Sequence, residues 1–378
     1  MLSSDSFNLT PMQRIARVTF INDSAFDSVK NANNLPKLVY VHLGKNPSPT
    51  LICSAAHAKK NGIFELILIT DEPATHAHFP GKIVKYKQQA NKKSLKSFNR
   101  RYPEKKSLAG GYWLNTMERI FALKSLEEII PRNSQIIHIE SDVYPYLSNA
   151  VLQILDKKGT EVALPRFSPE RGIGSIVYFK NLKALVESVE KFAEIMQNEI
   201  IENDMELFGS ALNKKLVSEL PSSPQSAWKI DEDVALLFDG ASFGQYLFGQ
   251  DPFHQNGELL SGFINPFSAI DYSEADWKLL DYEGSRYPSF RYRGTNYLLA
   301  NLHLHSKEVI PLIDGEEEFW ERVFSEANGL TERIARKTNI GSVHAKKTSM
   351  LTRIQIARRT GMWESFKRVK LKILHKKT

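Results

Sequence analysis

Short apolar runs separated by segments of helical character constrain the fold of this chain more than any other feature. Residues 37–43 (KLVYVHL) and 64–70 (FELILIT) are continuous apolar runs, and residues 50–60 between them have a helical pattern. A third run, 136–139 (IIHI), follows a segment from Tyr112 onward in which apolar residues recur at helical spacing. Strands that are buried on both faces of a parallel sheet have this continuous apolar character. The sequence therefore predicts an α/β fold with a mainly parallel sheet flanked by helices.

An acidic tripeptide, Glu140-Ser141-Asp142, directly follows the third apolar run. The carboxyl ends of the strands in an open α/β sheet are where such folds bind ligands. Two carboxylates at this place can hold a hard divalent cation such as Mg²⁺ or Mn²⁺, which suggests a phosphate-bearing substrate. The alternative is a strand-to-loop junction whose charges face water, and the rest of the sequence has to decide between the two.

Further chemical groups follow along the chain. Gly172 and Gly174 precede a predicted strand at 175–179, and Asn203 or Asp204 can cap a following helix. Residues 238–252 (FDGASFGQYLFGQDP), with Asp239 near their start, are rich in glycine, acidic and aromatic residues. Such a composition is more typical of a substrate-shaping segment than of a regular core element.

A histidine-containing strand is predicted near the end of the apolar pattern. Residues 297–304 (YLLANLHL) alternate enough to form a strand that places Asn301, His303 and His305 on one face. Lys307 follows directly. Two histidines separated by one residue form a weak metal motif by themselves, and a structural histidine is the default interpretation.

Taken in order, these segments resemble the GT-A fold glycosyltransferases, which transfer a sugar from a nucleotide-sugar to an acceptor. The resemblance covers roughly residues 37–310. It implies a GT-A domain at 1–314, with a nucleotide-binding half at about 37–145 and an acceptor-binding half at about 160–314. Residues 315–378 would form a basic helical extension. The local forms FDGASFGQYLFGQDP and NLHLHSK look like bacterial glycosyltransferases of surface polysaccharide or lipopolysaccharide synthesis.

The resemblance also implies roles for individual residues. Glu140-Ser141-Asp142 is an E-x-D variant of the family's D-x-D motif, which binds the metal and the donor's diphosphate and ribose. A later histidine, His303 or His305, would complete the coordination of the metal, and Lys307 would contact the phosphates. Asp204 would be the base in an inverting enzyme, with Asp239 as a second candidate. Gly172 and Gly174 match a loop that lets the donor and the acceptor approach the backbone.

The donor site is expected to extend over neighbouring strand ends and one helix. His42 and Leu43 end the first predicted strand, Asp71 ends the second, and Arg119 could reach a phosphate from the helix after Tyr112. Each residue also has a plainer interpretation, because Asp is common in turns and a helix-surface arginine is usually solvated. Trp113 is expected to be a packing anchor.

Charge and cysteine content bound the cellular setting. Residues 345–378 contain eleven Lys/Arg and the single acid Glu364, and the remainder has 39 basic and 42 acidic residues, so basicity is local. From residue 350 onward an amphipathic basic helix is expected to rest on an anionic membrane, the alternative being a solvated end. Because Cys53 is the single cysteine and no secretory or membrane-spanning segment is evident, we expect a cytoplasmic protein, peripheral at the inner face of the plasma membrane.

The leading hypothesis is thus a metal-dependent glycosyltransferase that uses a nucleotide-sugar, with UDP favoured, and a glycan or lipid-linked acceptor in cell-surface polysaccharide synthesis. A sugar-phosphate nucleotidyltransferase ranks lower because no G-x-G-T-R-like phosphate loop is found near the first strand. A nucleic-acid-binding protein is the third hypothesis. Its basic residues would be confined to residues 92–106 and the C-terminal segment, without a zinc-ligand spacing or an RNA-recognition motif.

Overall fold

The computed structural model describes residues 35–44, 49–86, 112–248, 270, 274–304, 318–325 and 327–328. The predicted basic helix, His305 and Lys307 lie outside these described residues.

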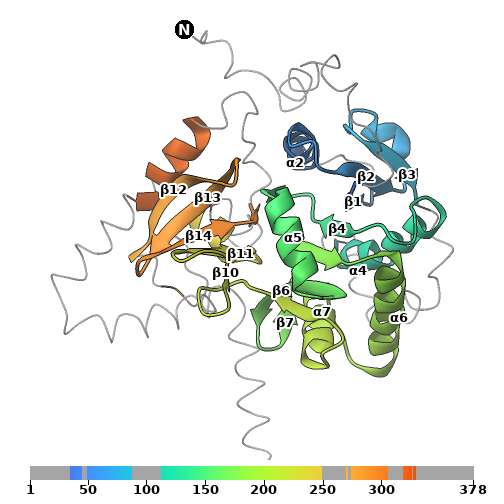
Figure 1. Ribbon diagram of the computed structural model, residues 1–378. Helices are drawn as coiled ribbons and strands as arrows, with labels where there is room; N and C mark the ends of the chain where they lie inside the picture. Colours follow the sequence, from blue (N-terminus) through green and yellow to red (C-terminus); the bar gives the residue numbers. More distant parts are fainter. Residues whose placement is uncertain are drawn as a thin grey trace, which may run out of the picture.

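The central sheet has the strand order β3-β2-β1-β4-β8-β6-β7, with β9 paired to β6 (Figure 1). Its strands are β1 (Lys37–His42), β2 (Glu65–Thr70), β3 (Lys82–Lys85), β4 (Ile136–Ile139), β6 (Val162–Ser168), β7 (Arg171–Gly172), β8 (Ile176–Phe179) and β9 (Ser218–Leu220). Strands β3, β2, β1 and β4 run parallel, whereas β8 pairs antiparallel with both β4 and β6. The predicted mixed, mainly parallel α/β sheet is confirmed.

Helices cover both faces of this sheet because alternate strand residues point to opposite sides. In β1, Leu38 and Tyr40 belong to one core, and Val39 and Val41 belong to the other. The first core is completed by α2 (Pro49–Lys60) and α5 (Asn149–Lys157). The second core is completed by α4 (Tyr112–Ala122), α6 (Leu182–Asn198) and α7 (Asp204–Asn213). The helix predicted from Tyr112 continues after α4 only as the 3₁₀ segment η8 (Leu123–Glu128).

A second sheet, which the sequence did not predict, lies beside the first (Figure 1). Its order is β10-β11-β14-β13-β12, formed by β10 (Trp228–Lys229), β11 (Val234–Leu237), β12 (Asp276–Tyr282), β13 (Ser285–Tyr292) and β14 (Thr295–Leu299). Buried residues of this sheet, including Leu236, Trp277 and Phe290, join the core beneath α2 and α5. Trp320 and Phe324, in the helical residues 318–325, pack into the same core, beyond the boundary expected at residue 314.

The expectation of one strand over residues 297–304 is wrong. The chain forms β14, breaks at Ala300 and continues as β15 (Asn301–His303), which pairs with β5 (Val143–Pro145) in a separate two-stranded sheet. The break lets the Ala300 N–H donate to Leu237 O at 2.9 Å, while Ala300 O accepts from the Tyr146 N–H at 2.8 Å. The chain therefore passes from the second sheet to the edge of the first.

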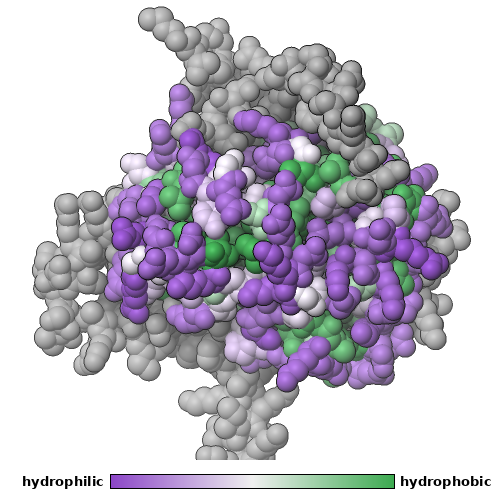
Figure 2. All heavy atoms as spheres, in the orientation of Figure 1, coloured by the Kyte–Doolittle hydropathy of each residue, from purple (hydrophilic) through white to green (hydrophobic). Residues whose placement is uncertain are grey.

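Hydrophilic residues cover most of the face shown in Figure 2, with smaller hydrophobic areas between them. None of the helices among the described residues combines the length and the apolar composition needed to cross a membrane.

Candidate functional site

The acidic tripeptide lies at the carboxyl edge of three adjacent parallel strands. Tyr40 of β1 is in register with Ile139 of β4, and His42 of β1 is in register with Thr70 of β2. The residues that follow β4, β1 and β2 therefore meet at one edge of the sheet.

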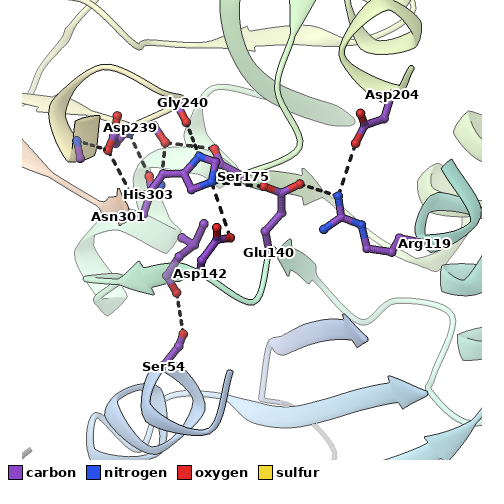
Figure 3. A network of polar contacts seen from close by, with 12 residues as sticks. Ser54, Arg119, Glu140, Asp142, Ser175, Asp204, Asp239, Gly240, Asn301 and His303 are labelled. Carbon is purple, nitrogen blue, oxygen red and sulfur yellow. Dashed lines mark hydrogen bonds and ion pairs between the residues drawn. The ribbon is translucent and has the colours of Figure 1, made fainter. Parts of the chain in front are cut away.

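Glu140, Asp142 and His303 form the site's centre (Figure 3). His303 Nε2 lies 3.4 Å from Glu140 Oε2 and 3.6 Å from Asp142 Oδ1. One potential ligand atom from each residue lies within 4.8 Å of the others, and no other such group is found in the part of the chain that the structure describes. Pairing of β15 with β5 explains the convergence, because His303 is in register with Val143, the residue after Asp142. The Leu304 N–H also donates to Asp142 O at 2.9 Å.

The orientation of His303 suits a metal ligand. Its Nδ1 lies 2.6 Å from Gly240 O, so Nδ1 carries the proton and donates it to this carbonyl. In the neutral ring, Nε2 then has its lone pair directed at the two carboxylates. A backbone carbonyl that accepts from the remote ring nitrogen is the usual support of a metal-bound imidazole. Two carboxylates and one imidazole fit a divalent cation such as Mn²⁺ or Mg²⁺.

The same geometry shifts the pKa of His303. Burial favours the neutral ring, but the charges of Asp142 and Glu140 outweigh burial and raise the pKa to about 9. In the absence of a cation the imidazolium is therefore the preferred form at neutral pH. A bound cation would take the place of this proton.

Arg119 approaches Glu140 from the side opposite His303 (Figure 3). Its Nη2 donates to Glu140 Oε1 at 2.7 Å and lies 3.4 Å from Asp204 Oδ2. All three side chains are mostly buried, with exposed fractions of 16%, 13% and 9% for Arg119, Glu140 and Asp204. Arg119 therefore holds one oxygen of Glu140 and leaves the other directed at His303.

Asp204 is the first residue of α7, and the preceding residue, Asn203, caps the helix through its side chain. Burial raises the pKa of Asp204 to about 6, although the Arg119 guanidinium lowers it and Glu140 adds to the rise. A carboxyl group with such a pKa can accept a proton near neutral pH.

Asp239 has the geometry of a structural carboxylate rather than a base. It is completely buried. Its Oδ1 accepts from the N–H groups of Ser242 and Phe243, and its Oδ2 accepts from those of Gly244 and His303, at 2.8 to 3.1 Å. These bonds occupy both oxygens and fix the start of α8 (Phe243–Phe248) against the backbone of His303. The expectation that Asp239 serves as a second base is therefore not retained.

Gly172 and Gly174 allow close packing of α7. A Cβ at residue 172 would lie 2.7 Å from Phe208 Cβ, and one at residue 174 would lie 2.9 Å from the Phe208 ring and 3.7 Å from Glu140 Oε1. The space that we expected a substrate to use at Gly172 is therefore taken by Phe208 of α7. Both glycines bring the helix that carries Asp204 close to Glu140.

The other predicted donor-binding residues follow the neighbouring strands. His42 ends β1 and its ring packs edge-on against that of His76, 5.0 Å away. Asp71 Oδ1 accepts from the Gly44 N–H at 2.8 Å, which gives this carboxylate a turn-stabilising role. Leu43 packs on the second core, and Ser141 lies half-buried between the two acidic residues.

Sequence reasoning named Asn301 and Asp239 but missed the contacts by which they position His303. The Asn301 side chain accepts from Asp239 N at 3.1 Å and donates to Asp239 O at 2.8 Å, and Ser175 Oγ also donates to Asp239 O. The sequence places Asn301 on the same strand face as His303, but it does not indicate that the hydrogen-bond partner of Asn301 is Asp239, 62 residues earlier in the chain. The unusual composition of residues 238–240 (FDG) was the one sequence signal that pointed to this segment.

No family model matches this chain, and no curated protein matches its sequence. The solved structures similar to it include the apo form of mouse xyloside xylosyltransferase 1, with 12% identity over 49% of this chain and 85% of that chain and a TM-score of 0.31. The apo glycosyltransferase GlyE of Streptococcus pneumoniae TIGR4 is 14% identical over 50% of this chain and 45% of that chain, with a TM-score of 0.34. Galactosyltransferase LgtC, in complex with donor and acceptor sugar analogues, is 10% identical over 46% and 70%, with a TM-score of 0.32.

The chain thus spans less than half the length of GlyE. All three proteins bear glycosyltransferase names, the class that the sequence motifs resemble. Overlaps of this size do not carry an assignment, so the function has to be argued from the residues of the site.

Proposed function

We propose that this protein is a metal-dependent glycosyltransferase that moves a sugar from a nucleotide-sugar to an acceptor hydroxyl. The observation that carries the proposal is the convergence of Glu140 and Asp142, after β4, with the Nε2 atom of His303, which comes from a segment about 160 residues further along the chain. The position of this cluster at the carboxyl edge of a parallel sheet suits a nucleotide ligand.

The chemistry requires positive charge beside the leaving group. Cleavage of the bond between sugar and phosphate leaves developing negative charge on the nucleoside diphosphate. A divalent cation held at this site would stabilise that charge. Asp142 and His303 are the ligands best placed to hold it, while Glu140 is oriented by Arg119 on one oxygen and offers the other oxygen.

Asp204 is the proposed proton acceptor for an inverting reaction. Its pKa of about 6 leaves the carboxylate ionised at neutral pH, ready to take the proton from an acceptor hydroxyl at one of its Oδ atoms. The glycines beneath α7 support this role because they bring the helix close to Glu140.

The finer parts of the proposal concern the donor, the acceptor and the cellular location. A UDP-sugar is the favoured donor, with His42, Leu43 and Asp71 along the neighbouring strand ends and Lys307 on the phosphates. A glycan or a lipid-linked glycan of cell-surface polysaccharide synthesis is the favoured acceptor. The protein would act in the cytoplasm, peripheral to the inner face of the plasma membrane through its basic C-terminal residues.

The central test is a thermal-shift screen of nucleoside diphosphates with and without Mn²⁺, followed by turnover of the matching nucleotide-sugars. We expect at least one diphosphate to stabilise the chain only when Mn²⁺ is present. Asp142→Ala should abolish this effect, whereas Asp276→Ala, an exposed aspartate of β12, should retain it. Equal, metal-independent stabilisation of the wild type and Asp142→Ala would rule out the proposed site.

The membrane proposal has a separate test. Flotation of the full chain with vesicles containing anionic lipid should fall in a variant with Lys367→Glu, Arg368→Glu and Lys372→Glu, because each basic residue near such a surface contributes about 1 kcal/mol. Unchanged flotation of this variant would refute peripheral attachment through the C-terminal residues.

A further inference from the structure

A cavity of about 550 Å³ lies between two helices and the second sheet. It is separate from the group formed by Glu140, Asp142 and His303, which we call the acidic cluster. Its walls come from the end of α2, the start of α5 and the tip of the β12–β13 hairpin at Glu283 and Gly284. Neither the three residues of the acidic cluster nor Asp239 lines it. Figure 1 shows α2 and α5 on the side of the first sheet that faces the second sheet. The volume is within the range typical of small-molecule sites.

The cavity has an aromatic base and a polar rim. Tyr146 and Trp320 line it while being almost completely buried, and their rings lie 6.1 Å apart at an angle of 70°. Among the polar residues of its rim, Lys60, Asn149 and Gln153 are exposed. The rim therefore offers side-chain amides and a cation above an apolar surface.

The lining matches a neutral polyhydroxylated ligand better than a strongly charged one. Glu283 is the acidic residue among those that line the cavity, and the positive charge of Lys60 offsets it. Arg286 also lines the cavity, but its own charge is offset by Asp281, to which it donates at 2.8 Å. Asn149 and Gln153 each supply one acceptor and two donor hydrogens, the combination that a sugar hydroxyl can satisfy.

Backbone donors at the start of α5 suit a polar ligand. Asn149 and Ala150, the first two residues of this helix, line the cavity, and their N–H groups have no helical carbonyl to donate to. A ligand oxygen in the cavity could accept from them.

We propose that this cavity is a second glycan-binding site, which holds a neutral sugar of the acceptor away from the reaction centre. The acceptor assignment rests on the proposed function. The cavity is near the reaction centre, because Tyr146 follows Asp142 by four residues and the two Cα atoms are at most ~14 Å apart.

The test is direct binding of glucose, galactose, mannose and N-acetylglucosamine to the full chain, monitored by the NMR signals of the Trp320 indole and of the Asn149 and Gln153 amides. We expect at least one sugar to shift these signals saturably. A Lys60→Ala/Gln153→Ala variant should weaken that sugar at least tenfold, and since both side chains are exposed the fold should persist. Lys59→Ala, which changes a lysine that does not line the cavity, is the matched control and should bind normally.

Further arms separate this proposal from the proposed transferase activity. Sugar binding should be unchanged by Asp142→Ala and by removal of divalent cations, because none of the three residues proposed to hold the cation lines the cavity. The absence of a shift with all four sugars would overturn the proposal, as would equal shifts in the double variant. A stronger response of the same signals to inorganic phosphate would identify an anion site instead and would also overturn it.

Discussion

Two aspartates that contact His303 are used in opposite ways. Asp142 retains an exposed fraction of 15% and faces the ring nitrogen of His303. Asp239 is completely buried and accepts four backbone N–H bonds. A carboxylate whose oxygens are already occupied fixes the structure, whereas one that faces other ionisable groups at an open edge is available for a ligand. The comparison indicates that burial and hydrogen bonding, not residue type, separate the two roles.

The largest effect is expected at Asp142. Asp142→Asn removes a ligand charge from the proposed cation site and should reduce turnover by a hundredfold or more, about 3 to 4 kcal/mol of barrier. Its unfolding free energy should fall by about 1 kcal/mol, less than for Asp239→Asn, because the change removes one charged partner of His303 from a side chain that is 15% exposed. Steady-state kinetics and denaturant unfolding measure the two. A large loss of stability would erase the contrast with Asp239.

The second prediction is the converse, at Asp239. Asp239→Asn turns an acceptor oxygen into an N–H donor that faces two backbone donors, and should lower the unfolding free energy by about 3 kcal/mol. Denaturant unfolding measures this loss, with Asp276→Asn as the exposed control. Wild-type stability in Asp239→Asn would show that the four N–H bonds are not needed.

A third prediction uses the pKa of Asp204, which is about 6 in the folded protein against an ordinary value of 3.8. The raised pKa means that protonation stabilises the folded state below about pH 4, and that this contribution is lost as the pH rises through about 6. Asn cannot titrate. Asp204→Asn should therefore gain stability relative to the wild type, by about 2 kcal/mol between pH 4 and pH 7.

Paired denaturant titrations at the two pH values check this prediction. Glu187→Gln, which changes an exposed carboxylate on α6, serves as the control. A stability difference between Asp204→Asn and the wild type that does not vary with pH would contradict the raised pKa.

The smallest effect is expected for an exposed ion pair. Lys183 and Glu187 on α6 lie 3.7 Å apart, with exposed fractions of 80% and 52%. Lys183→Ala should change the unfolding free energy by no more than about 0.5 kcal/mol, because solvent screens such pairs. Thermal unfolding measured at low and high salt tests this. A loss comparable with that of Asp239→Asn would mean that burial does not rank these interactions.

Local patterns in the sequence predicted the central sheet well. The runs that became β1, β2 and β4 are apolar because both faces of these strands are buried, so their identity and the acidic tripeptide after β4 can be read from neighbouring residues. The helix caps are equally local, as Asn203 before α7 illustrates.

The rest depended on contacts that are distant in sequence. β12 (DWKLLDY) is an edge strand with mixed burial, so its apolar pattern is weak, and no strand was predicted within residues 276–292. The support of His303 comes from Asp239 and Gly240, more than 60 residues earlier, and no periodicity signals such a contact. Arg119 was predicted as a phosphate contact, with a solvated helix residue as the alternative, and its ion pairs were missed because the two acidic partners lie 21 and 85 residues away.

The late position of β15 in the chain has a consequence for synthesis on the ribosome. Chains are made from the amino end, and early segments can fold before later ones emerge. Glu140 and Asp142 are translated long before His303, so a nascent chain has the acidic pair without its imidazole. The proposed cation centre is therefore completed only after the second sheet has been made, and a prematurely terminated chain lacks it.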